Sequence, residues 1–202
     1  MDEKLAGHFV QRFVNHRILI YSFEFDECDH ITFRIFTNMS SSAASVLLQK
    51  EFKSIQQDPS SGFSAGLIND DIFKWRVSLI GPPGTPYEGG IFPAILDFPQ
   101  DYPNHPPRMK FICPMYHPNI RETGEVCISI LHPPGDDIYE YEDRSERWLP
   151  IHSVESILVS VISMLSDPNC ESPENLDAAK TFRNDKPEYM RKVRRTVEQS
   201  LE

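Results

Sequence analysis

Residues 117–128 combine a cysteine and an amide side chain at a spacing that could serve acyl transfer. The segment reads H-P-N-I-R-E-T-G-E-V-C-I, so Cys127 follows Asn119 by eight positions. A thiolate is a nucleophile that forms covalent acyl intermediates, and an amide N–H can stabilise the oxyanion that develops when such an intermediate is attacked. Taken alone, Cys127 would more often be a small buried hydrophobe and Asn119 a turn residue. The choice between these structural roles and a catalytic role therefore depends on the surrounding sequence.

Further motifs accompany this pair along the chain. They are Y-E-G-G at 87–90, D-Y-P-N-H-P-P at 101–107, G-E-V-C-I at 124–128, Trp148 and D-P-N at 167–169. A lone H-P-N is a weak signal, but these motifs in this order are highly specific. From about residue 42 to residue 201 the chain resembles the ubiquitin-conjugating enzyme family.

This resemblance implies a transferase that works through a thioester. Cys127 would accept ubiquitin from the ubiquitin-activating enzyme and pass it to lysine amines of protein substrates, together with a ubiquitin ligase that we expect to be RING-type. No cofactor is expected, because ATP is used by the upstream activating enzyme. The loading step exchanges one thioester for another, so a thiol near its ordinary pKa of about 8.5 supplies enough thiolate without a dedicated base.

The resemblance also assigns roles to the H-P-N tripeptide. Asn119 would either stabilise the oxyanion formed during transfer or order the neighbouring loop, and one well-placed amide donor is worth about 3–4 kcal/mol. His117 and Pro118 are expected to support the site, with His117 shaping the loop rather than carrying protons.

The attacking lysine must lose a proton, and related enzymes use an acidic residue shortly after D-P-N. This chain has Ser172 where compact relatives carry the acid. Glu171 beside it, or an acid from the insert described next, is the alternative source of that carboxylate.

An acidic insert separates Leu131 from Trp148. Residues 132–147 carry six acids against two arginines, a net charge of about −4. The insert resembles that of the acidic-loop, G-type branch of the family, whose degradation-type enzymes assemble ubiquitin chains for proteasomal breakdown. A negative loop beside the thioester would attract and orient a lysine-bearing acceptor, and Asp136 and Asp137 are the candidate residues, although acidic runs are often no more than solvated loops.

Contact surfaces for the partners follow from the same resemblance. Lys50 and Lys53 belong to the first predicted helix, where they either contact the activating enzyme and the ligase or form a solvated face. The expected ligase contacts on two loops are Asn104, His105, Leu149, Pro150 and Ile151.

The positions of apolar residues predict the elements that hold this site. A helix should begin after Ser42 and end at Asp58-Pro59, and a second one should begin at Ser153, because their apolar residues recur at helical spacing. Between them, 75–80, 91–98 and 109–112 are typical of strands joined by short turns, with Pro93 indicating an edge strand. Two further helices are expected at 177–183 and from Asp185, where the order D-K-P-E suggests a capping box.

Helix, strands, long loop and helices in this order indicate an α+β fold. We expect an N-terminal helix, an antiparallel meander sheet, a central helix packed on the sheet and C-terminal helices. The core domain should span 39–202, with the insert at 132–147. Residues 1–38 lie outside the resemblance and follow neither a helical nor an alternating pattern, so we expect an extension that is either disordered or upstream of an alternative start near Met39.

Composition excludes several other classes of protein. A net charge of −10 argues against nucleic-acid binding, and the chain has no apolar run of the roughly 18 residues that a membrane span needs. Four cysteines without C-x-x-C spacing argue against a zinc site or a disulfide scaffold and favour a reducing compartment, so we expect a cytoplasmic protein, with the nucleus left open. Two alternatives remain: a catalytically silent ubiquitin-binding scaffold, and a cysteine hydrolase with His132 as partner.

Overall fold

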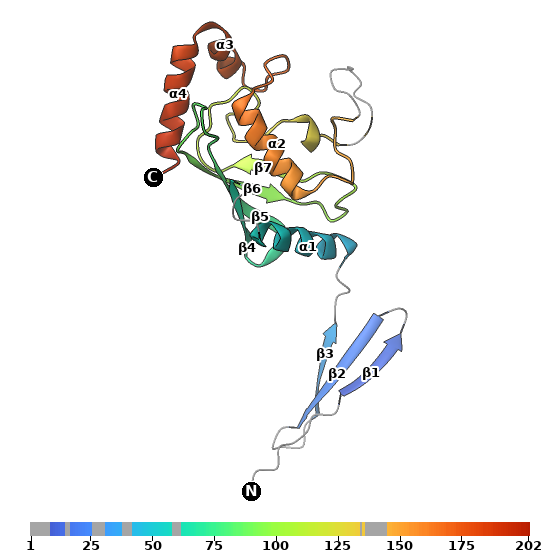
Figure 1. The fold of residues 1–202 in the computed structure, drawn as a ribbon. Helices are drawn as coiled ribbons and strands as arrows, with labels where there is room; N and C mark the ends of the chain where they lie inside the picture. Colours follow the sequence, from blue (N-terminus) through green and yellow to red (C-terminus); the bar gives the residue numbers. More distant parts are fainter. Residues whose placement is uncertain are drawn as a thin grey trace. The chain divides into compact units, whose positions relative to one another are not determined.

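The structure, a computed structural model, forms two compact units, Met1–Ala43 and Ala44–Glu202 (Figure 1). It describes residues 9–14, 17–25, 31–37, 42–57, 62–133, 135 and 145–202. The motifs that bear on function all lie in the second unit.

The first unit contains a small antiparallel sheet. Its strands are β1 (Phe9–Val14), β2 (Arg17–Phe25) and β3 (Ile31–Thr37), paired in the order β1-β2-β3. The sequence pattern had predicted neither helix nor strand here, although the richness of the segment in aromatic and β-branched residues is typical of strands. The expectation of an alternative start near Met39 stays a prediction.

The second unit is built on an antiparallel meander, as predicted, but with four strands in place of the three that the sequence indicated. Its strands pair in chain order: β4 (Phe63–Ile68), β5 (Asp71–Ile80), β6 (Ile91–Asp97) and β7 (Arg108–Phe111). Strand β4 was not predicted. It is joined to β5 by Asn69 and Asp70, both with φ between 50° and 60°, as the tightest hairpin turns require.

Pro93 lies in an interior strand, so the prediction of an edge strand was wrong. Strand β6 pairs with β5 on one side and β7 on the other. The Pro93 carbonyl accepts a hydrogen bond from Ile112 N at 2.9 Å, so the missing N–H of Pro93 faces that same side. Strand β7 has already ended at Phe111, and the proline is therefore tolerated where the ladder is locally open.

Four helices complete the second unit: α1 (Ala43–Gln57), α2 (Val154–Ser166), α3 (Leu176–Asn184) and α4 (Lys186–Gln199). The buried side of α2 belongs to the same hydrophobic cluster as the inward-facing residues of β5, β6 and β7, and Figure 1 shows α2 lying across the sheet. This confirms the predicted central helix. None of the described helices is long and apolar enough to cross a membrane.

The starts of α2 and α4 agree with the predicted positions, and the predicted capping box at Asp185 needs one correction. Ser153 caps α2 by accepting a hydrogen bond from Ser156 N, and Asp185 caps α4 by accepting one from Glu188 N. The reciprocal half of the predicted capping box is absent at the start of α4. Glu188 instead binds Arg191, while the Asp185 N–H donates to the carbonyl of Thr181.

Two partly buried sets of polar contacts connect the elements that flank the acidic insert. Glu51 of α1 accepts hydrogen bonds from Tyr102 Oη and from Val154 N at the start of α2, and burial raises the pKa of its carboxyl group. The indole of Trp148, which is fully buried, donates to the carbonyl of Pro103 at 2.7 Å. The loops around 101–105 and 148–153 are thus held next to each other and to α1.

Candidate active site

A tight reversal of the chain explains the eight-residue spacing between Asn119 and Cys127. Ile120 and Val126 form an antiparallel bridge, and Cys127 N donates to the carbonyl of Asn119 at 3.0 Å. Gly124 closes the turn with φ of 89°, and a Cβ atom there would lie 2.2 Å from the carbonyl oxygen of Phe111. Only glycine fits this position, because its positive φ disfavours other residues and the Phe111 carbonyl leaves no room for a side chain.

His117 fastens the tripeptide to α2. Its buried ring accepts a hydrogen bond at Nδ1 from Asn119 N and donates from Nε2 to the carbonyl of Met164, each at 3.0 Å. Burial lowers the pKa of His117 to about 4, so the ring is neutral at physiological pH. A neutral imidazole with both nitrogens engaged supports the loop-shaping role and leaves no nitrogen for proton transfer at the thiol.

Asn119 fastens the loop that follows α2. Its Nδ2 donates to the carbonyl of Asn169 at 2.7 Å, and its Oδ1 accepts from Asn169 N at 2.9 Å. Pro118 extends this attachment, because its carbonyl accepts from the amides of Glu174 and Asn175. An amide nitrogen carries two hydrogens, so an oxyanion would have to engage the second Nδ2–H of Asn119.

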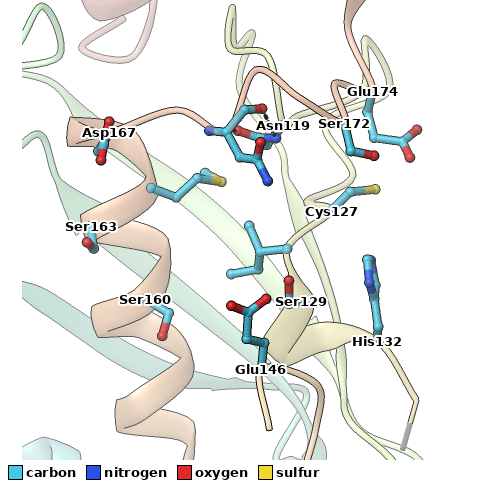
Figure 2. A pocket seen from close by; sticks show the side chains of 13 residues that line it. Asn119, Cys127, Ser129, His132, Glu146, Ser160, Ser163, Asp167, Ser172 and Glu174 are labelled. Atoms are coloured by element: carbon cyan, nitrogen blue, oxygen red, sulfur yellow. Dashed lines mark hydrogen bonds between the residues drawn. The ribbon is translucent and has the colours of Figure 1, made fainter. Parts of the chain in front are cut away.

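The half-buried thiol of Cys127 lies in a cleft of about 510 Å³. In Figure 2 it lies between the Ser172–Glu174 side and His132, with α2 forming the opposite wall. The lining residues come from the Cys127 loop, both ends of the insert, α2 and the loop after it: Asn119, Cys127, Ile128, Ser129, His132, Glu146, Ser160, Ser163, Met164, Asp167, Asn169, Ser172 and Glu174.

A second hollow is also lined by the same cysteine. It has a volume of about 450 Å³ and is bordered by the proline-rich loop at 103–107 and the turn at 121–125. Cys127, His132 and Glu174 line both hollows. A polypeptide tail crossing from one hollow to the other would therefore pass over the thiol.

Charged side chains line this second hollow together with the thiol. Arg121 binds Glu174 (Nε to Oε2, 2.8 Å) and Glu125 (Nη1 to Oε2, 3.0 Å). The pKa of Cys127 is raised, first by burial and then by the negative charges of Glu174 and Glu125, while Arg121 opposes the rise. The thiol is consequently not activated, which suits an exchange between thioesters of similar energy.

Sequence reasoning missed Arg121, Glu125 and Glu174. A signal was available, since Glu174 follows Asn169 of the D-P-N motif by five positions and Arg121 follows the H-P-N tripeptide by two. What could not be foreseen is that the two segments meet, because the contacts between them, from Pro118, Asn119 and Arg121, form only in the folded chain.

The residues that were predicted to supply or replace the acid differ in their positions relative to the cleft. Ser172 lines the cleft, whereas Glu171, also described, does not and donates its backbone N–H to Asn169 Oδ1. Asp136 and Asp137 lie outside the described residues, although Glu146 of the same insert lines the cleft.

The predicted partner-binding residues are at the surface, apart from the half-buried Leu149. Lys50 and Lys53 are exposed on α1, and Ile151 is 86% exposed. The loops that carry the remaining candidates are adjacent through the Trp148–Pro103 hydrogen bond; these candidates are Asn104, His105, Leu149 and Pro150.

Two observations concern other chemistry. Within the described ranges no group of three or more His, Cys, Asp or Glu residues is arranged to hold a metal ion. The cysteines that the structure describes, Cys113, Cys127 and Cys170, are free thiols.

Comparisons with known proteins identify the class. The sequence profile of the family described as "Ubiquitin-conjugating enzyme" matches residues 47–197. The chain is 61% identical over 165 residues to ubiquitin-conjugating enzyme E2 15 of Schizosaccharomyces pombe, covering 81% of this chain and 99% of that relative. It is 59% identical over 160 residues to the probable ubiquitin-conjugating enzyme E2 7 of Caenorhabditis elegans, covering 79% and 98%, and 49% identical over 155 residues to ubiquitin-conjugating enzyme E2 G2 of Bos taurus, covering 76% and 94%.

The fold and the matches together define a ubiquitin-transferring enzyme with an α+β core. The chain belongs to the ubiquitin-conjugating enzyme family. Membership implies ubiquitin, a ubiquitin-activating enzyme and a ubiquitin ligase as its partners. The predicted enzyme class and fold class are both confirmed.

Proposed function

We propose that Cys127 is the nucleophile that carries ubiquitin as a thioester. The observation that supports this most is the position of its half-buried thiol, which lines both hollows. In loading, the thiolate attacks the thioester carbonyl held by the activating enzyme. A new C–S bond forms to Cys127, the old one breaks, and the sulfur of the activating enzyme leaves as a thiolate.

Asn119 is proposed to serve the second step, in which an amine attacks the thioester. Its attachment to Asn169 supports ordering of the loop that lines the cleft, and its remaining Nδ2–H is a donor that could stabilise the oxyanion. The two roles are compatible, since a donor that is already held in place needs no reorganisation when the charge develops. His117 and Pro118 are proposed to hold Asn119 in this position.

The finer assignment is to the acidic-loop, G-type branch that builds degradative polyubiquitin chains with a RING-type ligase. Two facts support it: the six acids of the insert and the name of the bovine relative, E2 G2. Asp136 and Asp137 would attract acceptor lysines. The candidate contact residues for the activating enzyme and the ligase are Lys50, Lys53, Asn104, His105, Leu149, Pro150 and Ile151.

The remaining expectations are proposals of the same kind. Thioester exchange and aminolysis need neither a metal nor an organic cofactor in this chain, since ATP is consumed by the activating enzyme. The predicted reducing compartment would keep Cys127 as a thiol, which fits action in the cytoplasm, with the nucleus left open.

The test is a loading reaction with activating enzyme, ATP and ubiquitin, analysed without and with a thiol reductant. We expect a reductant-sensitive ubiquitin adduct that is lost in Cys127→Ala. Cys113→Ala is a matched control, because Cys113 is also a half-buried free thiol whose pKa burial raises, and its adduct should persist. Adding a RING-type ligase should then convert the adduct into ubiquitin chains.

Each alternative predicts a different result in that reaction. A silent scaffold would bind ubiquitin without forming an adduct, and a cysteine hydrolase would cleave a ubiquitin ester in the absence of the activating enzyme. Persistence of the adduct in Cys127→Ala would overturn the proposal.

A further inference from the structure

Arg121 and Glu174 form an ion pair directly beside the reacting thiol. Arg121 Nε lies 2.8 Å from Glu174 Oε2, and its Nη1 lies 3.0 Å from Glu125 Oε2. Arg121 belongs to the turn that returns the chain to Cys127, while Glu174 precedes the cap of α3 and is attached through its backbone to Pro118. The pair therefore joins the two segments that border the thiol.

Glu174 is the best placed carboxylate for a group that approaches Cys127 from solvent. Among the described acids of the two hollows, it is the one that lines both. The other charged or titratable side chains, apart from His132 and Cys127 itself, line one hollow each; they are Glu146, Asp167, His105, Arg108, Arg121 and Glu125. Glu174 is also close enough to influence the thiol electrostatically.

The pair is exposed enough to exchange partners. The side chains of Arg121 and Glu174 are 48% and 38% exposed. Exposed ion pairs contribute little net free energy, equivalent to a factor of about one to five in an equilibrium constant. A second cation could therefore replace the guanidinium at a modest cost.

We propose that Arg121 occupies, in the resting enzyme, the site on Glu174 that receives the ammonium group of the acceptor lysine. The proposal rests on Cys127 carrying the ubiquitin thioester, and it identifies the acid that the sequence left open between Glu171 and the insert. Arg121 acts as an internal competitor, so a lysine reaches the thioester in its productive position only after displacing the guanidinium. Acceptors that are held in place by a ligase meet this condition more easily than free amines do.

The transfer step balances as follows. The acceptor arrives as an ammonium ion hydrogen-bonded to the Glu174 carboxylate and loses one proton through that carboxylate to solvent. The amine lone pair forms the C–N bond, the oxyanion collapses, and the C–S bond breaks with its electrons going to the sulfur of Cys127. The second proton lost from nitrogen leaves the product as a neutral amide and returns Cys127 to the thiol.

Two substitutions that break the same ion pair should then act in opposite directions. Glu174→Gln removes the receiving carboxylate and should slow discharge of the thioester to free lysine by about tenfold. Arg121→Gln removes the competitor and should speed that discharge by about two- to fivefold, mainly through a lower KM for lysine. A purely structural ion pair would respond in the same direction to both changes.

The experiment uses full-length enzyme loaded with ubiquitin, freed of activating enzyme and ATP, and mixed with increasing concentrations of free lysine. The double variant is included because the gain from Arg121→Gln should vanish when Glu174 is already glutamine. Glu188→Gln is the matched control, since Glu188 forms an arginine pair of the same kind on α4, and its discharge should equal that of the wild type.

Three results would overturn the inference: slower discharge in both single variants, an unchanged rate in Glu174→Gln, or a gain that persists in the double variant. Thermal unfolding of each variant identifies any that fail to fold, and Glu174→Asp, which keeps the carboxylate, should recover part of the rate in a folded protein. If the wild type forms no thioester at all, the failure belongs to the proposed function and not to the role of Glu174.

Discussion

The two sides of the Cys127 loop are built from different kinds of interaction. On the inner side, the buried His117 and Asn119 use neutral hydrogen bonds, directed to Met164 and Asn169. On the outer side, Arg121 holds two carboxylates through ion pairs whose side chains are 38–48% exposed. Only a few residues of sequence separate the two sets.

This difference indicates that one side of the loop holds the thiol in place, while the other side can exchange partners. Buried neutral hydrogen bonds are costly to break, because the partner left behind is unsatisfied and has no access to water. Exposed ion pairs are easily exchanged, because water and other ions can replace either partner. The inner side therefore suits a fixed frame, and the outer side suits groups that must bind and release an acceptor.

The largest effect expected from breaking the inner frame is at Asn119. Asn119→Ala should slow discharge of the ubiquitin thioester by about 10²–10³-fold, because an oxyanion donor is lost together with the attachment to Asn169. Loading should be much less affected. Single-turnover discharge to lysine, compared with the rate of thioester formation, measures both steps.

Asn169→Ala is the matched comparison for that prediction. Asn119 contacts only the backbone of Asn169, so the alanine variant keeps both hydrogen bonds and should lose much less activity. If the two variants were equally slow, loop attachment through Asn119 would not account for the effect.

The next effect concerns the stability of the folded protein at acidic pH. It tests whether His117 on the inner side is buried and neutral. The folded pKa of His117 is about 4, below the unfolded value of about 6.5. Between these values the unfolded state binds more protons, so lowering the pH from 6.5 to 4 should remove about 3 kcal/mol of stability through this residue. Above pH 6.5 its contribution is complete.

Urea unfolding of the wild type and of His117→Gln across this pH range isolates the effect. The variant should be less stable at pH 7 but should lose less stability on acidification. The comparison cancels contributions common to both proteins, including that of Glu51, whose raised pKa acts in the opposite direction. Parallel pH profiles would show that His117 is not the buried neutral ring described above.

The smallest effect belongs to the outer side and concerns the reactivity of the thiol. Arg121→Gln leaves Glu125 and Glu174 unopposed and should raise the pKa of Cys127 further, so that alkylation at pH 7 slows by about two- to fivefold. Glu174→Gln should have the opposite effect. Rates measured with iodoacetamide between pH 6 and 10, in a background with Cys28→Ser, Cys113→Ser and Cys170→Ser, which leaves Cys127 as the one thiol, separate a changed pKa from a changed accessibility.

Salt provides the contrast between the two sides. Because the outer pairs are exposed, 1 M salt should shrink the differences among these alkylation rates. If the differences among the alkylation rates did not depend on salt, the charges of the outer side would be shielded from solvent. The outer side would then not differ from the inner side in exposure.

Much of the fold was predictable because local signals agreed with the tertiary structure. The apolar stripe after Ser153 and the capping residue itself define α2, and the proline after Asp58 accounts for the end of α1. Strand β4 was missed because its short sequence, F-S-A-G-L-I, includes glycine and small residues and reads as a strand only beside β5. Pro93 led to a wrong prediction of an edge strand, because its position relative to the end of β7 is a property of the assembled sheet.

The sequence by itself determined the class of protein, the identity of the candidate nucleophile and its eight-residue spacing from Asn119. These features depend on short-range chemistry, such as the positive φ of Gly124 and the eight-residue return to Cys127. Only the tertiary structure decided that Arg121 forms an ion pair with Glu174 and that the His117 ring is buried and neutral beside the site. The physical reason is that charge pairing and desolvation depend on distance and burial in space, and residues 121 and 174 become neighbours only when α2 and its following loop pack against the H-P-N turn.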